Sequence, residues 1–165
     1  MDKNKTNRRR FYIDVSTSDS PKWAKVGRGF IKFREKMSPR LYKRHYITDP
    51  TDTVTVLGYT PEIEFELDTR FSDPSCSRLR EIACGECVGE GAALSVLSVD
   101  ACDAVSEIGY PACRRRYTVT QGEYCTDLAT YKGILEADPK LERGTFYPSS
   151  VVFLKETDHS SEVGV

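Results

Sequence analysis

Acidic and apolar side chains alternate without interruption from residue 62 to residue 68 (EIEFELD). A period of two places alternate side chains on opposite faces of a β-strand. This segment therefore predicts a strand whose Ile63, Phe65 and Leu67 face a core. The opposite face carries four carboxylates: Glu62, Glu64, Glu66 and Asp68.

A different period follows at residues 73–85, where one α-helix is predicted. Apolar residues recur there at steps of three and four: Cys76, Leu79, Ile82 and Ala83. Asp73 is suited to cap the helix and Pro74 to its first turn, and Gly85 suits its C-terminal end.

The rest of the chain favours short strands separated by turn residues. A turn is expected at residues 58–61 (GYTP). The pattern predicts a mainly β fold of two packed antiparallel sheets, a sandwich or barrel, with one flanking helix. The expected strands lie near residues 11–15, 23–26, 30–33, 53–57, 62–68, 93–99, 112–120, 128–136, 144–147 and 151–155.

Residues 35–53 show neither period, and we expect a long extended loop there. Pro39 and Pro50 interrupt the segment, and its Leu41 and Ile47 need something to pack on. A loop of this length in a compact domain is usually functional or disordered. Residues 1–9 are expected to form a flexible basic arm and residues 157–165 a flexible tail, which leaves one domain over residues 10–156.

Composition and charge refine this picture. The chain has 165 residues, 39% hydrophobic and 30% charged, with a net charge of -1. No apolar stretch approaches the roughly 20 residues of a membrane span, and the basic start lacks the apolar run of a secretory signal, so we expect a cytoplasmic protein without a membrane partner.

The charges are unevenly distributed. Residues 1–50 hold fourteen basic and five acidic residues, whereas the remainder holds ten basic and twenty acidic ones. Two interpretations are open: the charges interleave when the chain folds, or basic and acidic surfaces meet between neighbouring copies.

No motif predicts catalysis, a cofactor or a metal. The two histidines, His45 and His159, lack an evident catalytic partner, and phosphate-binding glycine loops are absent. Cys84 and Cys87 form a CxxC, but at the end of the predicted helix, whereas redox pairs lie at a helix start. A zinc site needs two more ligands. We interpret the six cysteines as structural thiols, with metal binding and redox chemistry as alternatives.

The acidic face at residues 62–68 has two further interpretations besides catalysis, for which its regular spacing provides no distinct environments. It is either a solvated sheet face or the lining of a passage for nucleic acid. A negative wall repels phosphates and lets a duplex slide, whereas a positive wall binds it by releasing counterions.

The order of features along residues 10–156 resembles the major tail (tail tube) proteins of bacteriophages with long, non-contractile tails. A tryptophan-containing strand, a long loop, the acidic strand and a helix preceded by Asp73-Pro74 follow one another at the spacing of that family. The resemblance is carried by the segments 23–30 (WAKVGRGF), 46–49 (YITD), 54–61 (VTVLGYTP), 62–66 (EIEFE), 109–112 (GYPA) and 142–146 (ERGTF).

The resemblance implies a non-enzymatic virion protein that forms stacked hexameric rings around a channel for DNA. Loop 35–53 would reach the neighbouring ring, and Glu62, Glu64, Glu66 and Asp68 would be candidates for the lumen lining. Implied partners are further copies of the chain, tail initiator, tape-measure and terminator proteins, and viral DNA that passes without specific binding. Assembly would take place in the cytoplasm of a bacterial host. The candidate contacts between rings are Arg40, Tyr42, Lys43, Arg44 and Tyr46.

Two other functions are weighed against this one. The first is another β-rich phage component, such as a tail-end adaptor or an injection-system tube. The second is a zinc or redox protein that uses Cys84 and Cys87.

Overall fold

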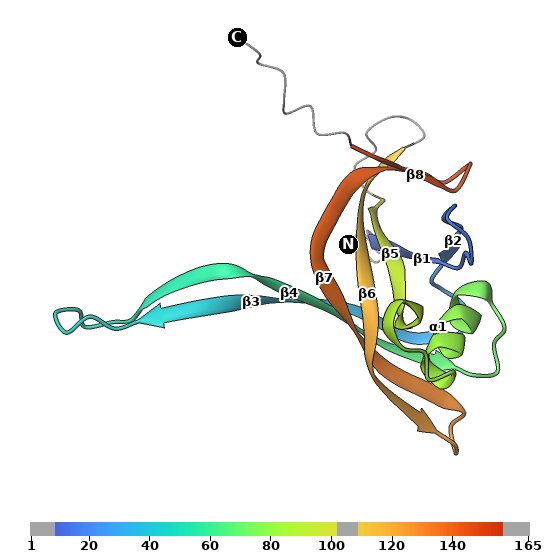
Figure 1. The fold of residues 1–165 in the computed structure, drawn as a ribbon, viewed down its shortest axis with the longest axis horizontal. Helices are drawn as coiled ribbons and strands as arrows, with labels where there is room; N and C mark the ends of the chain where they lie inside the picture. The colour runs from blue at the N-terminus through green and yellow to red at the C-terminus, as the bar shows by residue number, and fades with distance from the viewer. Residues whose placement is uncertain (1–8, 102–108, 157–165) are drawn as a thin grey trace, which may run out of the picture.

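The computed structural model describes residues 9–101 and 109–156 and has the predicted mainly β, antiparallel architecture with a flanking helix (Figure 1). Residues 1–8 of the predicted N-terminal arm and the predicted tail, residues 157–165, lie outside the described residues, as do Cys102 and His159, whereas Arg9 is the first residue of β1. The elements are β1 (Arg9–Asp14), β2 (Trp23–Lys25), β3 (Phe30–Arg44), β4 (Thr53–Asp68), α1 (Pro74–Cys84), the 3-10 helix η1 (Gly89–Ala92), β5 (Ala93–Asp100), β6 (Tyr110–Cys125), β7 (Thr130–Tyr147) and β8 (Val152–Lys155).

The described strands join in one hydrogen-bonded sheet rather than two separate ones. Its order is β2-β1-β5-β6-β7-β4-β3, and β8 pairs with β7. The sheet curls until β1 approaches β3: the rings of Phe11 and Phe33 lie 5.0 Å apart. Arg9 and Glu35 form an ion pair of 3.0 Å at the same place. This contact, which we call the seam, closes the fold through side chains, with no ladder between β1 and β3.

The main core lies inside the curl. Ile63, Phe65 and Leu67 are almost completely buried there, which confirms the inward face predicted from the alternation. Helix α1 covers this core with Leu79 and Ile82.

A smaller core lies on the other face of the sheet. In β5, Leu94 and Val96 point into the main core, while Leu97 and Val99 belong to the second cluster. Phe146 of β7 is fully buried in that cluster. Strands β1 and β5 are therefore apolar on both faces, and the sheet has a two-sided core without splitting into two sheets.

Helix α1 has nearly the predicted bounds, but its capping differs from the prediction. Asp73 occupies the N-cap position without a side-chain capping hydrogen bond, while its backbone oxygen accepts one from the Ser77 N–H. At the C-terminal end of the helix, the N–H of Gly85 donates to the backbone oxygen of Glu81. Among the described residues, no helix combines the length and apolar character needed to cross a membrane.

The loop predicted at residues 35–53 is wrong for most of its length. Strand β3 continues to Arg44 and pairs with β4, so only residues 45–52 connect the two strands. The turn predicted at 58–61 is also wrong, because these residues continue β4. Long-range pairing satisfies the backbone here although the local sequence contains prolines. Pro39 is tolerated because β3 is an edge strand and needs no N–H on its outer side.

Aromatic rings lie over glycines where β4, β6 and β7 meet. Gly133 pairs with Phe65 on one side and with Gly122 on the other. A Cβ at Gly133 would lie 2.5 Å from Phe65 Cζ and 2.6 Å from the backbone oxygen of Gln121. Phe65 also stacks on Tyr131 at 6.0 Å, so this glycine provides the space that the ring pair fills.

We therefore expect Gly133→Ala to lower the free energy of unfolding by about 1–3 kcal/mol, because backbone and a buried ring would both have to move. Urea denaturation measures the change. Gly27→Ala is the matched control, since a Cβ at Gly27 meets no atom within 4 Å. Equal stability of the two variants would contradict the packing described for Phe65.

Candidate assembly surface

A long β-hairpin projects from the body of the molecule (Figure 1). It consists of the distal parts of β3 and β4, residues 37–61, and we call it the arm. Strand β4 pairs with β7 only from Glu62 to Asp68. Beyond Glu62, both outer edges of the hairpin lack a pairing partner among the described strands.

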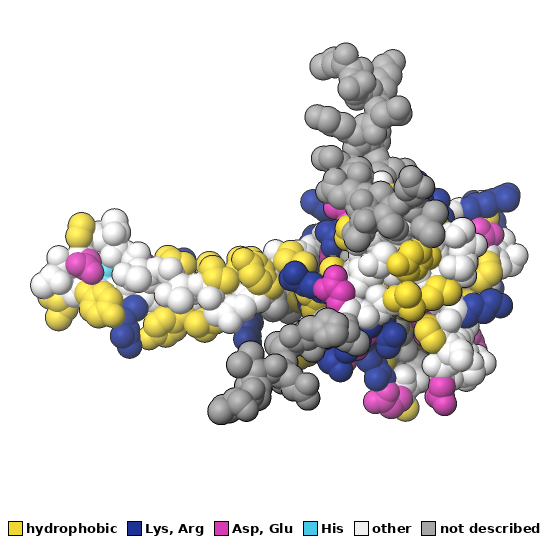
Figure 2. Space-filling view, turned by 90° about the horizontal axis from the view of Figure 1, so that it is seen from above, with side chains coloured by type: hydrophobic (Ala, Val, Ile, Leu, Met, Phe, Trp, Pro, Cys, Tyr) yellow, Lys and Arg dark blue, Asp and Glu magenta, His cyan; other side chains and the backbone are white. Residues whose placement is uncertain are grey.

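One face of the arm is apolar. Residues paired across an antiparallel ladder share a face, so the pairs Pro39–Tyr59 and Leu41–Val56 continue the core face of Phe65 outward. These side chains are exposed; Tyr59, for example, is 61% exposed. Figure 2 shows hydrophobic side chains along the length of the arm. The exposed apolar residues of the arm are Met37, Leu41, Tyr42, Tyr46, Ile47, Val54, Val56, Leu57 and Tyr59.

The opposite face is basic and aromatic. Arg44 lies over the rings of Tyr42 at 5.6 Å and Tyr46 at 5.7 Å. Its Nη1 donates to the Tyr46 hydroxyl at 3.2 Å, and hydrogen bonds to Tyr46 and Tyr42 raise the pKa of the guanidinium. Arg40 shares this face, above Gly58. Lys43 pairs with Val54 on the apolar face instead.

The five residues predicted to contact a neighbouring ring thus lie in the arm. Four of them, Arg40, Tyr42, Arg44 and Tyr46, lie on its basic and aromatic face. The apolar face was not predicted from the sequence. Its signal is the alternation of valine with threonine at residues 53–56, together with apolar residues at alternate positions 37, 39 and 41. These residues were divided between an expected strand and an expected loop, which hid their common face.

The carboxylates of β4 are partly neutralised by basic neighbours. Glu64 accepts from Lys32 at 2.8 Å and also pairs with Lys36. The hydrogen bonds from Lys32 and Lys36, of which that from Lys32 has the larger effect, lower the pKa of Glu64 to about 2. Glu62 and Glu66 lie on the same face, where Glu66 is in register with Lys132 of β7. This face therefore carries mixed charge rather than a bare acidic row.

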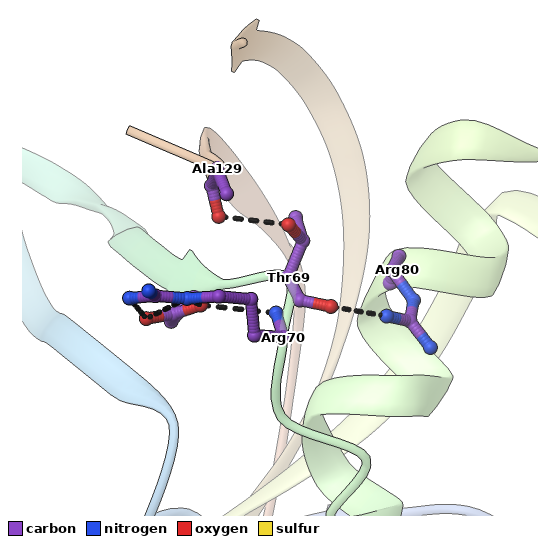
Figure 3. Close-up of polar contacts among 5 residues, drawn as sticks. Thr69, Arg70, Arg80 and Ala129 are labelled. Carbon is purple, nitrogen blue, oxygen red and sulfur yellow. Dashed lines mark hydrogen bonds and ion pairs between the residues drawn. The ribbon is translucent and has the colours of Figure 1, made fainter. Parts of the chain in front are cut away.

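Asp68 ends the row next to Arg70. Figure 3 shows Arg70 together with the hydrogen-bonded residues Thr69, Arg80 and Ala129. Asp68 pairs with Arg70 at 2.6 Å, and the hydrogen bonds from the Arg70 side chain and backbone lower the pKa of Asp68 to about 2. The hydroxyl of Thr69 donates to the Ala129 oxygen at 2.8 Å, while Arg80 of α1 donates to the Thr69 oxygen at 2.6 Å. These bonds hold the inner end of β4 against α1 and the β6–β7 turn.

The cysteines do not converge on one site in the described part of the chain. Cys84 is the last residue of α1, and Cys84 and Cys87 are exposed free thiols. Cys76 is buried in the main core, where burial raises the pKa of its thiol to about 11. Residues 9–101 and 109–156 contain no group of three or more side chains placed to hold a metal ion.

No protein-family model matches the chain, and no curated protein matches it. Its function is therefore inferred from its own residues, of which the exposed arm is the most distinctive group.

The Glu64 ion pairs generate a prediction about pH. Because the pKa of Glu64 is lowered from 4.5 to about 2 in the folded state, its stabilising contribution is present above pH 4.5. That contribution is lost as the pH falls from 4.5 towards 2. We expect Glu64→Gln to flatten the fall of the urea midpoint over this range.

Urea midpoints measured at several pH values test this prediction. Glu66→Gln removes a carboxylate from the same face of β4 and is the matched control. A Glu64→Gln curve parallel to that of the parent protein would contradict the ion pairs with Lys32 and Lys36.

Proposed function

We propose that this chain is a structural subunit of a bacteriophage tail tube, one that forms hexameric rings and stacks them into a channel for DNA. Support comes from the order of sequence features that resembles tail tube proteins of long, non-contractile tails. Further support comes from the arm. Tail initiator, tape-measure and terminator proteins are the proposed partners in the virion, together with DNA that passes through.

The single observation that carries this proposal is the uncovered apolar face of the arm. An isolated two-stranded hairpin is marginally stable in water. Exposed apolar patches of this extent mark interaction surfaces. Leu41, Val56 and Tyr59 are exposed on an element whose two backbone edges pair with no described strand, so a partner is needed to bury the side chains and protect the edges.

Self-assembly satisfies both needs. A projection that docks on a different surface of an identical copy makes a heterologous contact, and such contacts extend without limit unless they close into a ring. Stacked rings therefore require a contact of this kind along the tube. Other proteins would set the length of the tube.

Within such a tube, the polar face of β4 is the candidate lumen lining. Glu64 and Asp68 are already engaged by basic neighbours, so Glu62 and Glu66 are the carboxylates proposed to face passing DNA. A surface of mixed charge holds a polyanion less strongly than a basic one, because fewer counterions are released. DNA would therefore pass through the channel without specific binding to this face.

We expect removal of the arm to abolish stacking without unfolding the body. Replacing residues 39–59 with Asn-Gly would join Ser38 and Thr60, which are paired across the hairpin, through a two-residue turn. The body keeps its core, because the main cluster lies outside the arm. Electron microscopy of concentrated protein should show long tubes for the parent and none for the variant.

Thermal unfolding of the variant, with a midpoint near that of the parent, is the control for folding. Tubes of normal length from the armless variant would contradict the role of the arm. Single rings from the parent protein would instead favour a tail-end adaptor. Stoichiometric zinc that is lost in Cys84→Ser/Cys87→Ser would favour a zinc protein.

We expect Glu62→Lys/Glu66→Lys to make assembled tubes retain DNA if these side chains face the lumen. Positive charge on the wall releases counterions from DNA, so retention should fall steeply with salt. Co-sedimentation of tubes with duplex DNA measures it. Asp19→Lys/Glu86→Lys makes the same change of charge at exposed positions outside β4. Equal retention by both variants would place Glu62 and Glu66 elsewhere.

A further inference from the structure

Two exposed thiols lie at the point where α1 ends. Cys84 is the last residue of the helix, and Cys87 follows it after the turn formed by Gly85 and Glu86. Both thiols are free. Neither takes part in the contacts proposed for the tube, so their position at the helix end is considered separately.

The backbone between the two cysteines reverses its direction. Gly85 has a φ of -82° and a ψ of 1°, whereas Glu86 has a φ of +50°, in the left-handed region. A left-handed residue directly after a helix turns the chain back towards the last helical turn. The first and fourth Cα atoms of a tight turn lie within about 7 Å, and a disulfide spans about 4.4–6.8 Å. Cys84 and Cys87 occupy these first and fourth positions.

The side chain of Cys87 folds back over this turn. Its Sγ lies 3.5 Å from the position that a Cβ on Gly85 would occupy. The same Sγ lies 4.0 Å from the backbone oxygen of Glu81, in the last turn of α1. The thiol of Cys87 therefore points towards the helix end that carries Cys84.

Tyr131 of β7 lies close to both thiols. Its ring lines a hollow of about 260 Å³ together with Cys87, Ile82 and Gly122. Burial raises the pKa of Tyr131, and the charge of the nearby Cys84 adds to this effect. The two cysteines thus lie beside the same ring, and the hollow gives a small reagent access to them.

We propose that Cys84 and Cys87 form an intramolecular disulfide when the folded protein meets a low-molecular-weight disulfide as oxidant. The thiolate of one cysteine attacks the reagent, which forms a mixed disulfide and releases one thiol. The other cysteine then attacks the mixed disulfide and releases the second thiol. Two cysteine sulfurs are oxidised, the reagent is reduced to two thiols, and these take up the two cysteine protons.

The position at the C-terminal end of α1 favours a lasting crosslink over catalysis. A helix start stabilises a thiolate and makes a CxxC disulfide easy to reduce, as exchange enzymes require. The C-terminal end of a helix carries partial negative charge, and Glu86 lies between the two cysteines. Neither feature favours a thiolate. The disulfide is therefore expected to persist rather than to exchange with other proteins.

The crosslink would hold the end of the helix that covers the main core with Leu79 and Ile82. It would also hold Glu86 in a conformation that residues other than glycine adopt infrequently. The chemistry does not depend on the proposed function. That function would supply the occasion for it, since a virion assembles in a reducing cytoplasm and is then released into oxidising surroundings.

Treatment of the folded protein with oxidised glutathione tests the connectivity. Proteolysis after Glu81, Glu86 and Glu90 places the two cysteines on separate peptides, residues 82–86 and 87–90. Mass spectrometry of the parent should show these two peptides joined, two hydrogens lighter than their sum and free of glutathione. Glutathione retained on both peptides, or a bond from either of them to another cysteine, would overturn the proposal.

Two variants control this measurement. Cys84→Ser leaves Cys87 without its partner, so Cys87 should retain one glutathione. Cys125→Ser removes a thiol of β6 that is in register with Thr130, and it should leave the joined peptides unchanged.

A comparison of folded and unfolded protein separates this geometry from the general reactivity of a CxxC sequence. A bond that stabilises the fold must form more readily in the fold. The equilibrium constant of the bond against glutathione should therefore be about 10-fold larger in native buffer than in denaturing urea. The urea midpoint of the oxidised parent should exceed that of the reduced parent, while Cys84→Ser/Cys87→Ser should not respond to the oxidant.

An equilibrium constant no larger in the folded protein, or a urea midpoint that oxidation leaves unchanged or lowers, would overturn the proposal. These measurements do not require tubes. A failure of the tube function would therefore leave a positive result standing, and the absence of the disulfide would leave the tube function untouched.

Discussion

Backbone pairing between β3 and β4 is the constraint that determines the shape of this protein. At its inner end β4 is a central strand between β3 and β7, and the same strand continues outward as half of the arm. Pairing preserves the faces of the strands along this length. The direction in which Phe65 points into the core therefore determines which side of the arm carries Tyr59 and Val56.

Local periodicity made part of this fold predictable. The alternation at residues 62–68 and the three- and four-residue steps of α1 identified a central strand and the helix correctly. Residues 35–44 and 58–61 were predicted wrongly because prolines and a glycine suggested a loop and a turn, whereas these residues belong to β3 and β4, which pair with each other across the hairpin. The curl of one sheet, rather than two packed sheets, depends on long-range pairing and bulges that no local period reveals. The candidate contact residues do lie in the arm. Which face of the arm each of them occupies follows only from the pairing register of β3 and β4.

The two interpretations of the uneven charge apply to different parts of the chain. In the body, basic residues of the first third pair with acids within the same subunit, as Lys32 does with Glu64 and Arg9 with Glu35. Those charges interleave on folding. In the arm, Arg40 and Lys43 stay exposed, outside the ion pairs of the body. The arm is therefore one place where part of the asymmetry stays available for a contact with another molecule.

The seam between β1 and β3 has a mechanical consequence. Because Phe11, Phe33 and the Arg9–Glu35 pair close the fold without a backbone ladder, the two borders can separate by losing side-chain contacts only. Every strand keeps its hydrogen bonds during such a movement. The root of the arm follows this seam along β3, so a change in the curvature of the body would move the tip of the arm further than its root. In the proposed assembly, such a movement would let neighbouring subunits adjust to one another while each keeps its fold.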